Sequence, residues 1–381
     1  MNNKVVFIDT NSIGNFHEVF NAAFFKILET NFDTVLHVSS KSSFETIKRI
    51  LNNNEIKFDT SKITFKEVKV LEGTKSHHIF LRKIFAAVLL FFLLFKYRKR
   101  AIILANLNEF GTIYFNLFAK IFKTNLTIVA HGELEYLIQD VPKNKPIFIY
   151  KKFLQRFFKC KWNKRIQMIM LGDSIQKKMQ NLFPLNASSF VSMNHPYFFN
   201  NIESSLTEKP IKMGVVGSVG ENKGILSFFK LSERLEEFII SQQLELYVVG
   251  KHGYNPIDFP LIKFVGETNQ IIPTQEYNQA IQQLDAILFF YGADQYQLTA
   301  SGAIFDAVNH EKPIIAIENS YFKHVFSYGN IGFLGKNISE IEEVIKKIIL
   351  NEDILKEMNT FKNVKFAFSW ENITFPLKVN N

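Results

Sequence analysis

The feature that most constrains the fold is a repeated alternation of short apolar runs with helical stretches. The runs are apolar on consecutive residues, which is typical of strands buried on both faces of a parallel sheet. The first series is KVVFID, TVLHVS, AIILANL, LTIVAHG and MIMLGD, and the second is IKMGVVGSV, LELYVVG, IKFVGE, AILFFY, PIIAI and IGFLG. We therefore expect an α/β protein with two doubly wound, Rossmann-like domains.

A polar segment separates the two series of strands. This segment, NNIESSLTEKP at residues 200–210, has few large apolar side chains and ends in proline, as linkers commonly do. The chain is 381 residues long and 47% apolar, which suffices for two ordinary cores. We predict one domain over residues 1–205, a second over 206–362, and a C-terminal segment, 363–381, that packs back on the first domain.

The positive charge of the chain belongs to its first half. Residues 1–205 carry 29 Lys and Arg against 15 Asp and Glu, whereas residues 206–381 carry 16 against 21. This asymmetry favours an anionic partner of the first domain: phospholipid, a phosphate-bearing substrate or nucleic acid. We rank nucleic acid last, because the sequence has no zinc-finger, RNP-like or homeodomain-like pattern.

Cysteine usage and the first residues indicate a reducing compartment. Cys160 is the single cysteine, which excludes disulfides within the chain and any cysteine metal cluster. The start, MNNKVVFIDT, is typical of a strand and lacks the pattern of a signal peptide. We expect a cytoplasmic protein.

Residues 82–100, RKIFAAVLLFFLLFKYRKR, interrupt the simple alternation. The uncharged core of this segment, residues 84–95, is shorter than the roughly 20 residues that a spanning helix needs, so we expect that it does not cross a bilayer. It is either a fully buried helix or a helix lying in the membrane interface, and its basic ends favour the second reading. These basic residues are Arg82, Lys83, Lys96, Arg98, Lys99 and Arg100.

A second basic segment, residues 143–165, has nine Lys and Arg and no acidic residue. Basic residues next to an anionic membrane contribute roughly 1 kcal/mol each to binding. Together the two segments predict reversible attachment to the inner face of the plasma membrane.

The stretch LTASGAIFDAVNHEKPIIA, residues 298–316, follows an apolar strand and contains a short helical pattern. Thr299 or Ser301 is a suitable N-cap, and Gly302 allows close approach of a ligand to the backbone. A diphosphate is stabilised at such a helix start by free N–H groups. Asp306 lies one turn later, where it suits a ribose or sugar hydroxyl. An ordinary capped crossover helix explains the stretch equally well.

Two further glycine-rich turns occur in the same predicted domain. In GVVGSVGENKG, Gly217 follows a strand and Lys223 is predicted to open a helix. In VVGKHG, Gly250 and Lys251 form a turn suited to a base or ribose. The first turn matches neither the dinucleotide nor the P-loop spacing. However, turns after parallel strands gather at the carboxyl edge of a sheet, where ligands bind, so that Lys223 brings a charge to the phosphates.

The ordered set of these motifs resembles the donor half of the two-domain GT-B glycosyltransferases, especially bacterial family-4-like enzymes of surface-polysaccharide assembly. The motifs are GVVGSVGENKG, LYVVGKHG, IKFVGE, YNQAIQQLDAILFFY, TASGAIFDAVNHEKPIIAI and FSWENI. The resemblance covers about residues 206–375, and the first domain matches in architecture only. It implies two domains facing one another across a cleft, with a nucleotide-sugar in the cleft and its diphosphate near Lys223, Ser301 and Gly302.

The resemblance also assigns roles in the first domain and exposes two departures. Gly14 matches the loop that approaches donor and acceptor, and His131 the histidine presented to the transferred sugar. Ser218 stands where the family's usual turn has an arginine, which removes one cation from the phosphates. Leu298 stands at the first position of the family's E-x7-E element, so that an acidic residue remains only at Asp306.

An inverting transfer needs a base near the acceptor hydroxyl, and His131 and Glu133 are the candidates. A retaining transfer needs mainly charge stabilisation of the leaving diphosphate. His195 is read as packing near the linker. The sequence has neither Asp-x-Asp nor a His/Cys cluster, so no metal and no cofactor beyond the donor substrate are implied.

We therefore predict a metal-independent, membrane-associated bacterial glycosyltransferase that moves a sugar from a nucleotide-sugar to a lipid-linked saccharide in capsule, O-antigen or exopolysaccharide synthesis. One alternative is a nucleotide-sugar epimerase of the same fold, which needs no membrane face. The other is an inactive nucleotide-sugar-binding partner of a polysaccharide complex, suggested by Ser218 and Leu298.

Overall fold

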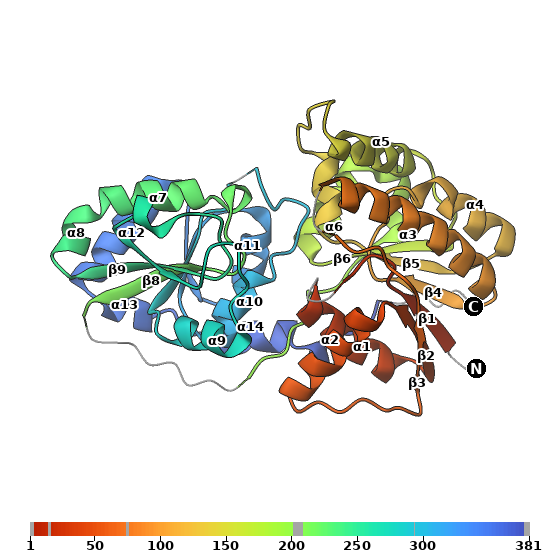
Figure 1. Ribbon diagram of the computed structural model, residues 1–381, viewed down its shortest axis with the longest axis horizontal. Helices are drawn as coiled ribbons and strands as arrows, with labels where there is room; N and C mark the ends of the chain where they lie inside the picture. Colours follow the sequence, from red (N-terminus) through yellow and green to blue (C-terminus); the bar gives the residue numbers. More distant parts are fainter. Residues whose placement is uncertain (1–3, 14–16, 74–75, 201–208, 293, 377–381) are drawn as a thin grey trace. The chain divides into compact units, whose positions relative to one another are not determined.

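The computed structural model describes residues 4–13, 17–73, 76–200, 209–292 and 294–376 (Figure 1). The chain divides into two compact units. Unit 1 comprises residues 1–198, 298–300 and 368–381, and unit 2 comprises residues 199–297 and 301–367. The domain bounds expected at residues 205 and 362 stay predictions, because residues 201–208 lie outside the described part of the chain.

Unit 1 contains a seven-stranded sheet in the order β3-β2-β1-β4-β5-β6-β7, in which every pairing is parallel. The expected strands are present, and two more occur at the edges of the sheet. The residues of β3 are mostly exposed and β7 has three residues, so neither forms a continuous apolar run. The strands are β1 (Lys4–Ile8), β2 (Thr34–Ser39), β3 (Ile63–Glu67), β4 (Ala101–Leu104), β5 (Leu126–Val129), β6 (Ile166–Met170) and β7 (Phe190–Ser192).

Helices cover both faces of this sheet, as parallel strands require. Figure 1 shows α1 and α2 on one face and α3, α4 and α5 on the other. The helices of unit 1 are α1 (Glu18–Asn31), α2 (Lys41–Asn53), α3 (Ser76–Tyr97), α4 (Thr112–Phe122), α5 (Pro146–Lys159) and α6 (Asp173–Leu182), with the 3-10 turns η1 (Gly132–Leu137) and η2 (Pro184–Ser189).

Unit 2 contains a six-stranded parallel sheet in the order β10-β9-β8-β11-β12-β13. The order reverses direction at β8, which gives the doubly wound topology expected for an α/β protein with two parallel sheets. The strands are β8 (Ile211–Val216), β9 (Leu244–Val249), β10 (Ile262–Val265), β11 (Ala286–Phe289), β12 (Ile314–Ile317) and β13 (Gly332–Gly335).

Short helices connect the strands of unit 2. A seven-residue helix, α10 (Ala303–Asn309), occupies the stretch between β11 and β12. The others are α7 (Ile225–Arg234), α8 (Glu236–Ile240), α9 (Thr274–Gln282), α11 (Ser320–Phe326), α12 (Ile338–Leu350), α13 (Asp353–Lys356) and α14 (Phe361–Phe368), with the 3-10 turns η3 (Glu221–Lys223) and η4 (Pro256–Asp258).

The C-terminal residues 368–376 belong to unit 1. The backbone of Tyr197 bridges to Ser369, and Gln167 Nε2 donates to the carbonyl oxygen of Pro376 at 2.5 Å. The ammonium of Lys26 lies 5.7 Å from the ring centre of Trp370, in the 3-10 turn η5 (Trp370–Asn372). Phe375 is buried in the core of unit 1.

Helix α3 contradicts one of the two readings of residues 82–100 and leaves the interfacial reading a prediction. It begins six residues earlier, at Ser76, and its stretch His77–Tyr97 is long and apolar enough to cross a membrane by length and composition. Helix length therefore gives no support to the expectation that the segment does not cross a bilayer, and that expectation stays a prediction. A fully buried helix is wrong, because only 28% of its most apolar window is buried. One face, including Ala86, Leu90 and Leu94, is buried, and the opposite face is exposed.

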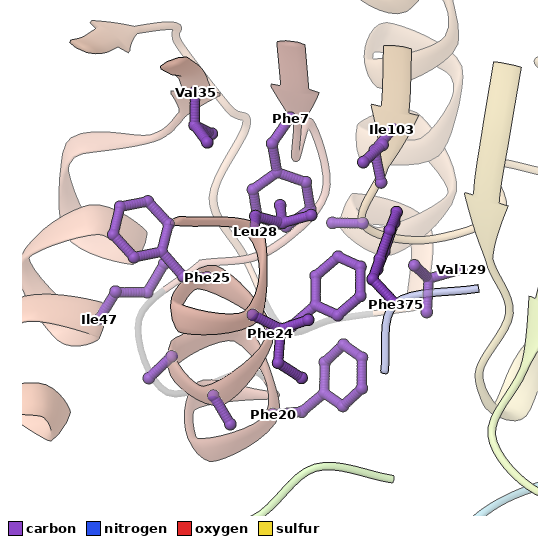
Figure 2. Packing of buried hydrophobic residues seen from close by; sticks show 14 of the residues in the cluster. Phe7, Phe20, Phe24, Phe25, Leu28, Val35, Ile47, Ile103, Val129 and Phe375 are labelled. Atoms are coloured by element: carbon purple, nitrogen blue, oxygen red, sulfur yellow. The ribbon is translucent and has the colours of Figure 1, made fainter. Parts of the chain in front are cut away.

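Aromatic rings dominate the core of unit 1 around α1. Phe24 is fully buried, and its ring centre lies 5.5 Å from that of Phe7 and 5.7 Å from that of Phe375 (Figure 2). The C-terminal segment thus fills a gap between α1 and the sheet.

We expect Phe24→Ala to destabilise the protein by about 3–5 kcal/mol, because the substitution leaves a cavity that is enclosed by packed rings. Phe92→Ala is the matched control: its side chain is 63% exposed, so a change within about 0.5 kcal/mol is expected. Urea unfolding followed by circular dichroism measures both. Equal effects of the two substitutions would contradict this packing.

Candidate functional site

The turn after β8 is held against the turn after β9 by backbone hydrogen bonds. Gly217 N donates to Val249 O at 2.9 Å, and Val219 N donates to Lys251 O at 2.8 Å. Gly217 has a φ of 89° and Gly250 a φ of 129°, a region that favours glycine. A Cβ on Gly250 would lie 2.0 Å from Gly217 O, so the two turns are in direct contact.

Lys223 lies at the end of this turn, in η3, and not at the start of a helix as expected. Gly224 follows with a φ of 74°, and α7 begins at Ile225. The Lys223 ammonium lies 5.9 Å from the ring centre of Tyr291 and lines a small pocket with Val219 and Tyr291. Burial lowers the pKa of Lys223, and the negative charge of Asp306 opposes this shift. An anion in the pocket would further stabilise the charged form.

The cap expected at residues 299–301 is wrong. The N-cap of α10 is Gly302, and no side chain caps it. Ser301 is buried, and its hydroxyl donates to the Tyr291 hydroxyl at 3.4 Å. Thr299 belongs to unit 1, where its Oγ1 is buried without a hydrogen-bond partner. Because α10 has only seven residues, its dipole is weaker than that of an ordinary helix.

Asp306 lies in the first turn of α10 and is held by a residue that sequence reasoning missed. Tyr277, on α9, donates its hydroxyl hydrogen to Asp306 Oδ2 at 2.9 Å. The aspartate is therefore oriented by a phenol and attracts the ammonium of Lys223.

The residues predicted for the donor site in unit 2 thus lie together. A Cβ on Gly217 would lie 3.7 Å from the Cβ of Ala303 and 3.8 Å from the Tyr277 hydroxyl, which joins the β8 turn to the start of α10. Gly302 is exposed, with no atom within 4 Å of its would-be Cβ. Ser218 and Lys251 are exposed beside these turns.

Tyr291 lies two residues after the end of β11 and connects these groups. It is buried, its ring stacks on that of Tyr296 at 4.2 Å, and its hydroxyl accepts from Ser301. Burial raises the pKa of Tyr291, so it is a neutral phenol at ordinary pH. Sequence reasoning assigned Tyr291 to a strand and missed this role, because its partners are distant in the chain.

In unit 1, His131 follows β5 and lies among buried rings. Its Nε2 lies 3.0 Å from Ala105 O, and since a carbonyl only accepts, Nε2 carries the hydrogen. The ring stacks on His17 at 4.4 Å. Burial lowers the pKa of His131 to about 3, with a further contribution from His195, so the imidazole is neutral at pH 7.

His17 and His195 are two residues of this cluster that sequence reasoning did not assign to the site. The ring of Phe20 contacts two of the three histidines. Its ring centre lies 4.6 Å from that of His131 and 5.1 Å from that of His195. Burial lowers the pKa of His17 and His195 to about 3. Gly14 lies outside the described residues.

Glu133, on η1, is partly buried at the same edge of the sheet. Its Oε1 accepts from the backbone amides of Leu107 at 3.0 Å and His131 at 3.1 Å. Lost hydration raises the pKa of Glu133 to about 7, and the neighbouring charge of Glu109 adds to the rise. A carboxyl with this pKa exchanges its proton at neutral pH.

Leu298 also lies in unit 1. Its backbone amide donates to Glu135 Oε1 at 2.6 Å, so a carboxylate of η1 contacts the chain at this position. In the part of the chain that the structure describes, no three His, Cys, Asp or Glu side chains form a group that would hold a metal ion.

We expect Gly250→Ala to destabilise the protein by at least about 2 kcal/mol, because the methyl group meets Gly217 O and the φ is unfavourable. Gly302→Ala is the control: its φ of −70° is helical and its surroundings are open, so a change within about 0.5 kcal/mol is expected. Thermal unfolding of both variants measures this. A tolerated Gly250→Ala would show that the turns are not in contact.

The sequence matches no family model and resembles no curated protein, so the comparisons that inform the fold are structural. WaaG, a glycosyltransferase involved in lipopolysaccharide biosynthesis, aligns with a TM-score of 0.61 at 12% identity, over 96% of this chain and 95% of WaaG. HepE of Anabaena, in complex with UDP, aligns with a TM-score of 0.60 at 12% identity, over 97% and 96%.

A third similar structure is TarM of S. aureus, in a complex that contains UDP. It aligns with a TM-score of 0.62 at 12% identity, over 97% of each chain. All three alignments cover both units and so include both of their parallel sheets. The chain therefore has the GT-B fold of these glycosyltransferases.

Proposed function

We propose that this chain is a glycosyltransferase that moves a sugar from a nucleotide-diphosphate sugar to a saccharide acceptor. The observation that carries the proposal is the meeting, in unit 2, of the Gly217 turn, the ammonium of Lys223 and the start of α10. The carboxyl edge of a parallel sheet, where the strand order reverses, is the usual ligand site of such folds. HepE, which shares the fold, binds UDP.

Each group at this edge has a role in the proposed transfer. Lys223 and the backbone near Gly217 and Gly302 stabilise the negative charge that develops on the departing diphosphate. Asp306, oriented by Tyr277, accepts hydrogen bonds from ribose or sugar hydroxyls. Because α10 is short, Lys223 rather than the helix dipole is the main source of positive charge.

If the transfer is inverting, Glu133 is the favoured one of the two candidate bases in unit 1. A base must hold a proton at working pH, and the pKa of His131, about 3, is too low for that. The pKa of Glu133, about 7, is suitable. His131, with its Nε2–H donated to Ala105, keeps Nδ1 as an acceptor for a sugar hydroxyl.

We further propose that the acceptor is lipid-linked and that unit 1 binds the anionic inner leaflet of a bacterial plasma membrane. Support comes from an apolar surface, the α3–α4 face, on two neighbouring helices whose rings contact each other, as Phe91 does with Tyr114 at 5.4 Å. Its exposed residues are Leu81, Ile84, Phe85, Val88, Phe91, Phe92 and Phe95 on α3 and Ile113, Leu117 and Ile121 on α4.

Basic side chains surround one end of the α3–α4 face. The Arg98 guanidinium lies 4.4 Å from the Phe95 ring centre and 5.9 Å from that of Phe122. Lys96, Lys99, Arg100, Lys120 and Lys123 are exposed nearby in sequence. An apolar face with a basic rim is typical of helices in the interface of an anionic membrane. Basic residues of segment 143–165 add to the same attraction.

This surface favours a transferase of lipid-linked saccharides, as in capsule, O-antigen or exopolysaccharide synthesis, over a nucleotide-sugar epimerase, which needs no membrane. WaaG acts in lipopolysaccharide biosynthesis. The alternative of an inactive nucleotide-sugar-binding partner is favoured by Ser218 and Leu298, which replace expected polar contacts with the donor. Sugar transfer, measured separately from nucleotide release, distinguishes that alternative.

For the donor site, we expect Lys223→Ala to weaken binding of the preferred nucleotide-sugar roughly 10- to 100-fold, because a charge-assisted contact to phosphate is lost. Calorimetry with UDP, GDP, CMP and dTDP sugars identifies the donor and measures the loss. Lys230→Ala, at an exposed position on α7, is the control and is expected to bind as wild type. Binding unaffected by Lys223→Ala, or no binding of any donor, would contradict the proposal.

For the membrane surface, we expect Phe92→Asp to abolish most sedimentation with vesicles that contain anionic lipid, since a charge replaces an apolar side chain at the centre of the α3–α4 face. Ile257→Asp, at an 84% exposed position in unit 2, is the matched control. Donor binding is expected to be unchanged in both. Equal vesicle binding by the two variants would show that α3 does not contact lipid.

A further inference from the structure

The turn after β4, residues 105–107, contacts both candidate bases of unit 1 through two different peptide groups. The carbonyl oxygen of Ala105 lies 3.0 Å from His131 Nε2, from which it accepts a hydrogen bond. The amide of Leu107 donates to Glu133 Oε1 at 3.0 Å. Asn106 lies between these two peptide groups. Because peptide bonds are planar, the φ and ψ of Asn106 set how the two groups are oriented relative to each other.

The side chain of Asn106 is bound by a carboxylate that follows the neighbouring strand. Asn106 Nδ2 donates to Asp9 Oδ1 at 3.2 Å. Asp9 directly follows β1, and Asn106 follows β4 by two residues. The strand order β3-β2-β1-β4 reverses direction at β1, which pairs with β4. The hydrogen bond therefore joins the two strands at the point where such sheets bind their ligands.

Asp9 is itself firmly anchored. It is 2% exposed, and its amide donates to Val38 O at 2.8 Å. Its Oδ1 also accepts from the amides of Asn11 at 3.0 Å and Ser12 at 2.9 Å, which hold the carboxyl group in one orientation. A side-chain amide that binds so rigid an acceptor loses most of its freedom. The hydrogen bond thus also restricts the backbone of Asn106.

The two peptide groups of the turn are fixed in different ways. Ala105 N donates to Ile8 O at 2.9 Å, so the ladder between β1 and β4 holds the first group. The amide of Leu107 lies beyond this ladder and donates to a side chain, that of Glu133. The orientation of the second group therefore depends on Asn106.

Glu133 takes its place from both turns at this edge of the sheet. Its Oε1 accepts a second hydrogen bond, from the amide of His131 at 3.1 Å, so the carboxyl group bridges the turns after β4 and β5. The His131 ring, by contrast, is held by Ala105. A movement of the Leu107 amide would therefore displace Glu133 relative to the ring of His131.

We propose that Asn106 is a positioning residue for Glu133. Its hydrogen bond to Asp9 orients the amide of Leu107. That amide then holds the Glu133 carboxyl group at one place relative to the His131 ring. The inference rests on the proposed function for its purpose, but the order of this turn is a property of unit 1 and can be measured without sugar transfer.

The first test measures hydrogen exchange at the Leu107 amide by NMR of ¹⁵N-labelled protein. We expect Asn106→Ala to speed this exchange roughly 10- to 100-fold, because the loss of a hydrogen bond to a carboxylate lets the turn open. Glu133→Ala removes the acceptor of the amide and gives the upper limit. Asn116→Ala is the matched control and is expected to leave this exchange unchanged. Asn116 is also half-buried and makes two hydrogen bonds to backbone groups elsewhere in unit 1.

Two substitutions that keep the side-chain shape separate the hydrogen bond from the charge. Asn106→Asp removes the donated hydrogen, so exchange at Leu107 is expected to rise at least as much as in Asn106→Ala. Asp9→Asn keeps an oxygen that accepts from Asn106, so a smaller rise is expected. The proposal is overturned if both changes at Asn106 leave this exchange unmoved. It is also overturned if Asp9→Asn has the full effect of Asn106→Ala, which would assign the effect to charge.

The tautomer of His131 distinguishes positioning from a general loss of structure. It is measured by NMR of protein labelled with ¹⁵N in histidine. In the wild type and in Asn106→Ala alike, the hydrogen is expected on Nε2, because the ladder still holds the Ala105 carbonyl. If Asn106→Ala lost this tautomer together with the protection of Leu107, Asn106 would merely keep the edge folded, and the proposal would fail.

Activity separates this inference from the proposed function. Once a donor and acceptor are known, Asn106→Ala is expected to lower kcat roughly 10- to 100-fold with donor binding unchanged, because a base is misplaced while the donor groups lie in unit 2. The expected exchange results without sugar transfer by the wild type would overturn the proposed function and leave the positioning of Glu133 intact. Transfer by Asn106→Ala with the kcat of the wild type would overturn the positioning role.

Discussion

The candidate donor site, at the carboxyl edge of the sheet of unit 2, depends on one backbone contact. This contact is the close approach of the turns after β8 and β9. With no Cβ at Gly250, the carbonyl of Gly217 fits against it, and two backbone hydrogen bonds hold the turns in register. The chain that follows β8 turns at Gly217 and again at Gly224, where both glycines have a positive φ. As a result the ammonium of Lys223 lies in the pocket next to Tyr291. A side chain at position 250 would displace this whole arrangement.

The charged and titratable groups of the two units differ. In unit 2, a partly desolvated ammonium lies near an oriented aspartate, an arrangement suited to a ligand that has both phosphate and hydroxyl groups. In unit 1, burial keeps the histidine cluster neutral and leaves a carboxyl poised near neutral pH. Part of the excess positive charge of the first half of the chain lies in the basic residues next to the α3–α4 face.

The α/β class and the two parallel sheets were predictable because strands buried on both faces are apolar at every position. The same rule failed for β3 and β7, which lie at sheet edges. The approach of the Gly217 turn to α10 also follows from topology, since turns after parallel strands share one edge.

The predicted cap at Ser301 was wrong because its hydroxyl contacts Tyr291, a partner that local sequence does not reveal. Tyr277 and His17 were missed for the same reason, and Lys83, expected among the basic residues at a membrane, instead pairs with Glu109. The length of α3 was underestimated because Arg82 and Lys83 lie within it, and Lys83 is neutralised by Glu109.

The central claim is that Lys223 and the backbone at the start of α10 bind the diphosphate of a nucleotide-sugar. A crystal structure of the protein with its preferred nucleotide-sugar tests this most directly. The account predicts a phosphate oxygen within hydrogen-bond distance of Lys223 Nζ and the nucleotide beside Asp306. Phosphates bound at any other place in unit 2 would contradict it.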